Sequence, residues 1–118
     1  MPKHGALGQF EQVVLTTIVD LADTAYGVTI HRAVGELSKP RSVSLGAVYA
    51  TLDRLEDKGL ITSWLSGPTP ERGGRSRRYY RLEPAGMRAL YESVRMSKRI
   101  CERLELAWGS TIWNGGPA

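Results

Sequence analysis

The sequence predicts a mainly α-helical domain with one small β-hairpin, an α+β fold class. Apolar residues recur at three- and four-residue spacing in four stretches, as on one face of a helix. Two short segments rich in aromatic and branched residues, 60–66 and 77–83, have the composition of β-strands. A chain of 118 residues, 42% of them hydrophobic, is long enough for one modest core. We therefore expect one compact unit.

The first two helices are expected over residues 8–21 and 26–37, where the apolar stripe is continuous. The segment between them interrupts the pattern, and Asp23 or Thr24 is available to cap the second helix. Pro40 ends that helix, because a proline disfavours helical backbone for the residue before it.

The third helix, residues 44–58, has the clearest ends. Ser44 is a good N-cap, and Gly59 favours a helix stop. The residues expected to face the core fall within one arc: Leu45, Val48, Leu52 and Leu55. The opposite surface begins with residues that have little or no side chain, namely Gly46, Ala47 and Ala50.

The two predicted strands flank a loop of about ten residues, which is longer than the usual loop of roughly two to five. Trp64 on the first strand is expected in the core rather than as a stacking platform. Pro84 stands at the first turn of a long final helix, residues 85–108, where its missing N–H costs little. The tail, residues 109–118, is expected to be irregular.

The positive charge of the chain is concentrated in one segment. Residues 67–81 hold five arginines against one glutamate, a net charge of +4, which equals the net charge of the whole chain. The other residues therefore sum to zero. Arginines beside glycines in a long loop indicate a polyanionic partner, whose backbone the loop can approach closely.

The predicted order of elements is three helices, a β-hairpin with a basic tip, and a long helix. This order is the winged helix-turn-helix arrangement, in which the third helix reads DNA and the hairpin is the wing. We expect residues 1–84 to form the DNA-binding domain. Residues 85–118 are then a C-terminal dimerisation helix and its tail.

Four stretches of the sequence resemble the PadR-like family of bacterial transcriptional regulators: LGQFEQVVL, AYGVTIHRAV, SVSLGAVYATLDRLEDKGLI and PTPERGGRSRRYYRLEPAG. The resemblance spans roughly residues 7–90. It implies a homodimer that binds operator DNA, usually as a repressor, and that dimerises through its C-terminal helix. Beyond residue 90 no motif of the family is present, so no effector site is carried over and any small-molecule effector stays unknown.

The DNA-binding surface is expected to combine the third helix with the wing. Small outer residues let the helix N-terminus sit deep in a major groove, and the hydroxyls and guanidinium groups reach bases or phosphates. Two interpretations stay open for Tyr49, a DNA contact or a partly buried ring, and Tyr26 has the alternative of packing on the first helix. The candidates are Tyr26, Ser44, Gly46, Ala47, Tyr49, Ala50, Thr51, Arg54, Arg72, Arg75, Arg77 and Arg78.

The final helix has a heptad pattern, with Ser97 as its one polar interruption. A second subunit in a two-fold dimer would cover such a stripe. The alternative is an ordinary helix that faces the core of its own chain. The expected interface residues are Met87, Leu90, Val94, Cys101, Leu104 and Trp108.

No catalytic or metal-binding pattern is visible in the sequence, so we expect neither an enzyme nor a cofactor. The two histidines are far apart, and a single cysteine builds none of the recurring zinc patterns. The first residues, MPKHGALGQF, lack the apolar core of a signal peptide, and no apolar run approaches about 20 residues. A cytoplasmic protein without membrane attachment is therefore expected.

Two functions from different classes fit these features. A homodimer that binds double-stranded DNA and controls transcription explains the localised charge. The alternative is a winged-helix adaptor that binds other proteins without specific DNA contacts. Single-stranded nucleic acid is a lesser variant, because only Tyr79 and Tyr80 accompany the arginines. Trp108 and Trp113 are expected as interface anchors rather than as walls of an effector pocket.

Overall fold

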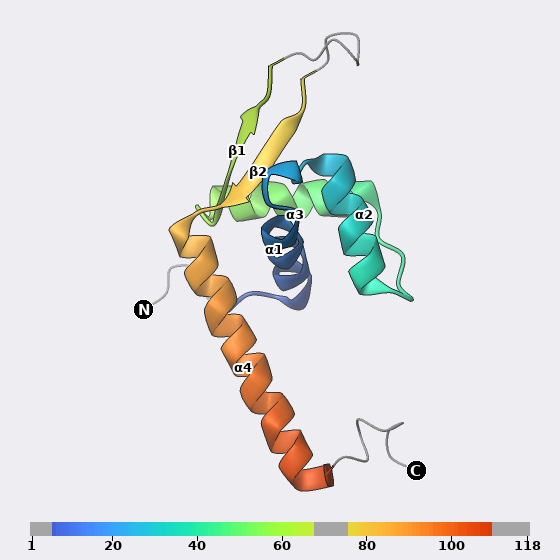
Figure 1. Cartoon of the computed structure of the whole chain (residues 1–118), viewed down its shortest axis with the longest axis vertical. Coiled ribbons are helices and arrows are strands. Elements are labelled where there is room, and N and C mark those ends of the chain that lie inside the picture. Colours follow the sequence, from blue (N-terminus) through green and yellow to red (C-terminus); the bar gives the residue numbers. More distant parts are fainter. Residues whose placement is uncertain (1–5, 68–75, 110–118) are drawn as a thin grey trace.

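The structure, a computed structural model, describes residues 6–67 and 76–109 (Figure 1). Its elements are α1 (Gln9–Leu21), the short 3₁₀ turn η1 (Ala22–Thr24), α2 (Gly27–Ser38), α3 (Leu45–Asp57), β1 (Ile61–Leu65), β2 (Arg78–Leu82) and α4 (Pro84–Trp108). Both the predicted fold class and the predicted order of elements are confirmed.

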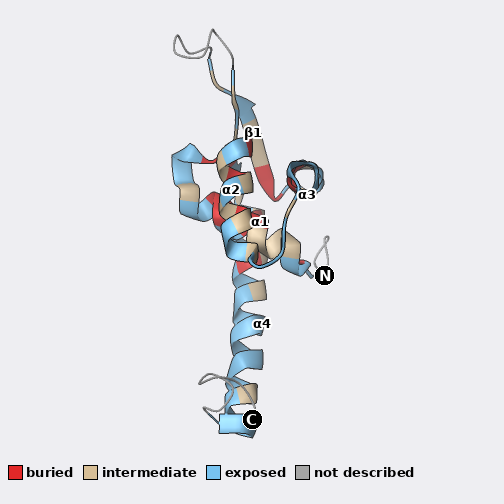
Figure 2. Cartoon of the chain, turned by 90° about the vertical axis from the view of Figure 1, so that its right-hand side faces the viewer, coloured by how far each residue is buried: buried red, intermediate tan, exposed pale blue. Residues whose placement is uncertain are grey.

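The core lies where the first three helices meet the base of the hairpin. In Figure 2 the buried residues gather at this junction of α1, α2, α3 and β1. Val48, Leu52 and Leu55 of α3 are fully buried, as their spacing predicts. Leu45 departs from the expected arc and is 41% exposed, because it stands in the first turn of α3 at the edge of the core.

The ends of the helices follow the local sequence in most places. The Ala47 N–H donates to the Ser44 hydroxyl at 3.1 Å, which confirms the predicted N-cap of α3. Gly59 has a positive φ of 76°, as expected just after a helix. The predicted cap of α2 was wrong. Its N-cap is Tyr26, and the Tyr26 N–H donates to the Thr29 hydroxyl at 3.0 Å.

The hairpin is an antiparallel pair of strands in which Trp64 lies opposite Tyr79 and Ser63 lies opposite Tyr80. The segment before α2 joins β2 as well, since the Tyr80 N–H donates to the Ala25 carbonyl at 2.9 Å. Side chains alternate between two faces along a strand. Tyr80 is buried on the core face, whereas Trp64 lies on the other face and is 41% exposed. The expectation that Trp64 belongs to the core was therefore wrong.

Helix α4 begins at Pro84, as predicted, and its first two turns pack on the domain. A Cβ added to Gly86 would overlap the Leu60 carbonyl oxygen and lie 3.0 Å from the carbonyl carbon, so a glycine allows the close approach of α4 to the residue before β1. The rest of α4 extends away from the body of the molecule (Figures 1 and 2). Within the described residues, no helix is both long and apolar enough to span a membrane.

Candidate nucleic-acid interface

The outward surface of α3 carries the small residues that the sequence singled out. Gly46, Ala47 and Ala50 are all exposed, and no atom lies within 4 Å of a Cβ built at Gly46. Ser44 is exposed at the start of this surface, where its hydroxyl caps the helix. Between the partly exposed Leu45 and Tyr49, the first two turns of α3 therefore present a strip of backbone and methyl groups.

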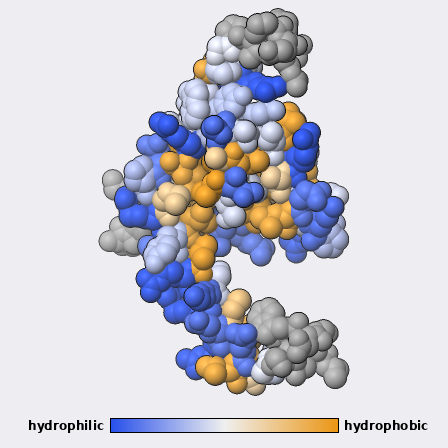
Figure 3. Space-filling model, in the orientation of Figure 1, coloured by the Kyte–Doolittle hydropathy of each residue, from blue (hydrophilic) through white to orange (hydrophobic). Residues whose placement is uncertain are grey.

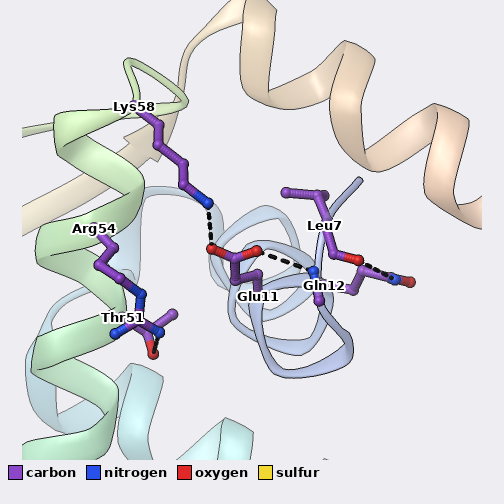
Figure 4. A network of polar contacts seen from close by, with 7 residues as sticks. Leu7, Glu11, Gln12, Thr51, Arg54 and Lys58 are labelled. Carbon is purple, nitrogen blue, oxygen red and sulfur yellow. Dashed lines mark hydrogen bonds and ion pairs between the residues drawn. The ribbon is translucent and has the colours of Figure 1, made fainter. Parts of the chain in front are cut away.

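Thr51 lies elsewhere than expected. It is only 2% exposed, and its hydroxyl accepts a hydrogen bond from the Arg54 guanidinium at 3.0 Å (Figure 4). Arg54 itself is exposed. The buried Thr51 hydroxyl can thus orient the Arg54 side chain, but Thr51 is too buried to contact DNA itself.

Tyr49 is half-buried on the side of α3 that faces α2 and the hairpin. A Cβ built at Gly27 would lie 2.7 Å from Tyr49 Cζ, so the ring packs directly on the first turn of α2. Burial raises the pKa of Tyr80, and the neighbouring Tyr49 adds to that effect. The ring of Tyr49 is thus partly covered, and with 41% of the residue exposed both interpretations of Tyr49 stay open.

Two polar contacts outside this surface hold α3 in place. The Lys58 ammonium lies 2.8 Å from a carboxylate oxygen of Glu11, which ties the end of α3 to the start of α1 (Figure 4). Burial raises the pKa of Glu11, but Lys58 and the Gly8 N–H together outweigh it and leave that pKa below its ordinary value. At the other end of α3, His31 Nε2 lies 2.7 Å from the Val43 carbonyl.

The arginines of the wing separate onto two faces, as strand alternation predicts. The Arg78 guanidinium donates to the Ser63 hydroxyl at 2.9 Å, and that hydroxyl donates to a Glu56 carboxylate oxygen at 2.8 Å. Arg78 therefore lies on the face of the hairpin that is turned toward α3. Two further candidates, Arg72 and Arg75, lie outside the described residues.

Arg77 lies on the opposite face, next to a set of aromatic rings that sequence reasoning missed. Its guanidinium carbon lies 4.4 Å from the centre of the Tyr26 ring. The Tyr26 ring in turn meets Tyr79 edge to face, with centroids 5.4 Å apart. Alternation along the strands could have placed Trp64 and Tyr79 on one face, but nothing local to the strands points to Tyr26 as their neighbour.

Helix α4 carries most of the candidate dimer residues on its projecting part. Met87, Val94 and Trp108 are each about half exposed or more, at 49%, 52% and 56%. Cys101 is exposed, and Leu104 is partly exposed. Leu90 differs, because at 9% exposure it belongs to the core of its own chain.

A groove of about 1050 Å³ runs between residues 6–12 and α4. It is lined in part by Leu7 and Gln12 from the start of the chain and by Ala89, Met96 and Ile100 from α4. Ala89, Met96 and Ile100 form a second apolar row on α4, which the heptad pattern did not predict. In the face drawn in Figure 3, hydrophilic side chains cover much of the projecting part of α4, with apolar ones near its end.

Residues that could hold a metal ion are scattered. Within residues 6–67 and 76–109 no three histidine, cysteine, aspartate or glutamate side chains come together as a candidate site. The candidate binding surfaces of the described residues are therefore the outward surface of α3, the basic hairpin and the apolar groove beside α4.

Comparison with known proteins identifies the relatives of this chain. The sequence model of the transcriptional regulator PadR-like family matches residues 14–92. The transcriptional regulator Rv3488 of Mycobacterium tuberculosis is 39% identical over 75 residues, which are 62% of this chain and 64% of that protein. The chain thus matches somewhat less than two thirds of that relative's length.

Two solved structures share the fold. A PadR family transcription regulator from Clostridium difficile R20291 is 28% identical, with a TM-score of 0.67, over 86% of this chain and 98% of that one. A PadR-like transcriptional regulator from Bacillus cereus is 22% identical, with a TM-score of 0.67, over 82% of this chain and 88% of that one. At 22% identity, the similarity to the Bacillus cereus protein shows a shared fold alone.

Proposed function

The chain belongs to the PadR-like family of transcriptional regulators, and from this we propose that it binds a double-stranded DNA operator as a homodimer and represses transcription there. The function resides in residues 1–84, and residues 85–118 join the two subunits. We expect it to act in the cytoplasm, without a catalytic step and without a cofactor.

The outward surface of α3 is the part that enters the major groove. Gly46, Ala47 and Ala50 allow the helix backbone to come close to the base edges, because no side chain stands in the way. The free N–H groups of the first turn and the Ser44 cap face the phosphates on either side. Arg54, oriented by Thr51, reaches a base or a phosphate further along.

The acidic residues of α3 limit how much of the helix can approach DNA. Asp53 and Asp57 are exposed and Glu56 is partly buried, all in the second half of the helix. These carboxylates repel phosphates, so only the first half of α3 lies in the groove. The wing, with Arg77 and Arg78, then contacts the neighbouring backbone, and Arg72 and Arg75 remain part of this proposal.

The proposal of a homodimer is based on the exposed surface of α4. From Tyr91 to Gly109 every residue is exposed except Ser93 and Leu104, which are partly buried. Met87 near the base of α4 and Val94 and Trp108 on its projecting part are each about half exposed, and this apolar area stays in water unless a partner covers it. We place the interface at Met87, Val94, Cys101, Leu104 and Trp108, and we leave out Leu90, which has little surface to lose.

The exposed, small-residue surface of α3 beside a basic hairpin is the observation that carries the proposal. The test is to incubate the full chain with sheared genomic DNA, sequence the fragments that it retains, and measure its affinity for one such fragment and for a scrambled duplex. We expect a preference of at least about a thousandfold for the retained fragment. An adaptor would retain no particular fragment. Repression is then tested by transcription in vitro from a promoter that overlaps the retained site.

A further inference from the structure

Three aromatic rings form one continuous row of contacts along the outer face of the hairpin. Tyr79 meets Tyr26 edge to face at 5.4 Å between centroids, and it stacks on Trp64 at 6.0 Å with an angle of 21° between the planes. We call Tyr26, Tyr79 and Trp64 the aromatic ladder. Its members come from the N-cap of α2, from β2 and from β1, so the ladder joins the helix-turn-helix to the wing.

An arginine closes each end of the aromatic ladder. The Arg77 guanidinium lies over the Tyr26 ring at 4.4 Å, and the Arg81 guanidinium lies over the Trp64 ring at 5.4 Å. Residues 77, 79 and 81 are alternate positions of one strand or its extension, which puts both arginines and Tyr79 on the same face. In the described part of the chain, the ion pairs found involve neither guanidinium.

Stacking changes what these two arginines can do. A free arginine loses much side-chain entropy when it is immobilised on a ligand. A guanidinium that already lies over an aromatic face is held in one place, while its N–H groups stay available to an anion. Arg78 on the opposite face lacks this support and is engaged by Ser63.

We propose that Tyr26, Tyr79 and Trp64 are positioning residues that hold Arg77 and Arg81 in place for the phosphate backbone of double-stranded DNA. The proposal rests on the DNA binding proposed above and adds Arg81 to its contacts. Tyr26 acts in it through its ring, by supporting Arg77, and not through its hydroxyl. Trp64, which is 41% exposed, supports Arg81 in the same way.

The test compares Tyr26→Phe with Tyr26→Leu on one duplex that the wild type binds. Tyr26→Phe keeps the ring and loses the hydroxyl, so its affinity stays within about twofold of wild type. Tyr26→Leu loses the ring in both subunits, so its affinity falls by about 5- to 30-fold. Its slope of log affinity against log salt stays unchanged, because the arginine charges are still present and still release counterions.

The arginines themselves give the complementary result. Arg77→Ala and Arg81→Ala each lower the salt slope by up to about 1.8 per dimer, since each removes one phosphate contact per subunit. Arg77→Lys keeps the charge without the flat stacking group, so its affinity drops while its slope is kept. Arg88→Lys, at an exposed arginine of α4 that stacks on none of the three rings, is the control and changes neither quantity.

Several results would overturn the inference. A loss of affinity in Tyr26→Phe equal to that in Tyr26→Leu would assign the role to the hydroxyl. An unchanged affinity in Tyr26→Leu, or an unchanged slope in Arg81→Ala, would remove the positioning role or the Arg81 contact. If thermal unfolding shows that Tyr26→Leu is not folded, the affinities of Arg77→Lys and Trp64→Leu test the inference instead. Wild-type affinity in both would overturn it. A wild type that binds no duplex overturns the proposed function together with this inference, whereas failure of the variants alone overturns only the inference.

Discussion

The ring of Tyr49 lies directly against Gly27, so the second turn of α3 and the first turn of α2 touch. A Cβ at Gly27 would lie 2.7 Å from Tyr49 Cζ and would overlap the hydroxyl oxygen. Tyr49 is 41% exposed, and the Gly27 backbone is buried beneath it. The contact sets how closely the two helices of the helix-turn-helix approach, which fixes the position of the surface proposed to read DNA.

Gly27→Ala is therefore expected to destabilise the fold. The added methyl group must displace the Tyr49 ring, and overpacking of this kind costs about 1–3 kcal/mol. Gly46→Ala is the matched control, because no atom lies within 4 Å of the added methyl group and alanine is the better helix former. Urea unfolding measures both variants. Equal stability of Gly27→Ala and wild type would contradict the close contact.

The Glu11–Lys58 pair should make stability depend on pH. The pKa of Glu11 lies below its ordinary value of 4.5 in the folded chain, so the pair stabilises the fold above about that pH. The stabilisation is lost as the pH falls through the lowered pKa. Glu11→Gln should cost about 1 kcal/mol at pH 7, since the carboxylate side chain is only 12% exposed, and should weaken the loss of stability in acid.

The control for this experiment is Glu36→Gln. Glu36 pairs with Lys39 at 3.2 Å, but both side chains are more than two thirds exposed, at 69% and 68%. Its removal should leave the unfolding free energy nearly unchanged at every pH. Parallel pH profiles of Glu11→Gln and wild type would refute the prediction.

The dimer is tested by charges placed on the apolar row of α4. Val94→Glu combined with Leu104→Glu should give monomers in sedimentation equilibrium, because two buried carboxylates per subunit would face the partner. These monomers should bind DNA poorly, since each would hold a single half-site. Leu106→Glu, at 81% exposure and on another side of the helix, is the control and should remain dimeric. Dimers that survive the double substitution would rule out this interface.

The small residues on the outside of α3 should matter for their size. Ala47→Glu or Ala50→Glu adds bulk and negative charge at an exposed position, so specific binding should fall by at least about a hundredfold while the thermal midpoint hardly moves. Fluorescence anisotropy on the selected duplex measures the binding. If the affinity of both variants equals that of wild type, another surface reads the DNA.

The arginines of the wing should differ in their salt dependence. Each phosphate contact contributes about 0.9 to the slope of log affinity against log salt, so one lost contact removes up to about 1.8 in a dimer. Arg78→Ala should have the smaller effect among the described arginines, because Ser63 and Glu56 already engage that side of the wing. For Arg75→Ala we expect a flatter slope with little change in stability. A solvated loop without DNA contacts predicts the same slope for all variants.

The sequence by itself determined the order of the main elements and most of their ends. The stop at Gly59, the cap at Ser44 and the start at Pro84 are local effects of backbone freedom, a side-chain hydrogen bond and a missing N–H. Helical periodicity likewise predicted the burial of Val48 and Leu55 correctly. Such features depend only on residues within one or two turns, so a single sequence is enough to predict them.

Only the tertiary structure decided the burial of residues at the margins of these apolar faces and the contacts between distant segments. Thr51 and Leu45 stand at the margins of the apolar arc of α3, and neighbouring elements bury the polar residue and leave the apolar one half exposed. The aromatic ladder has the same origin, because Tyr26 and Tyr79 are far apart in the chain and meet only when the segment before α2 joins β2. Contacts of this kind depend on how whole elements pack, and no local pattern encodes them.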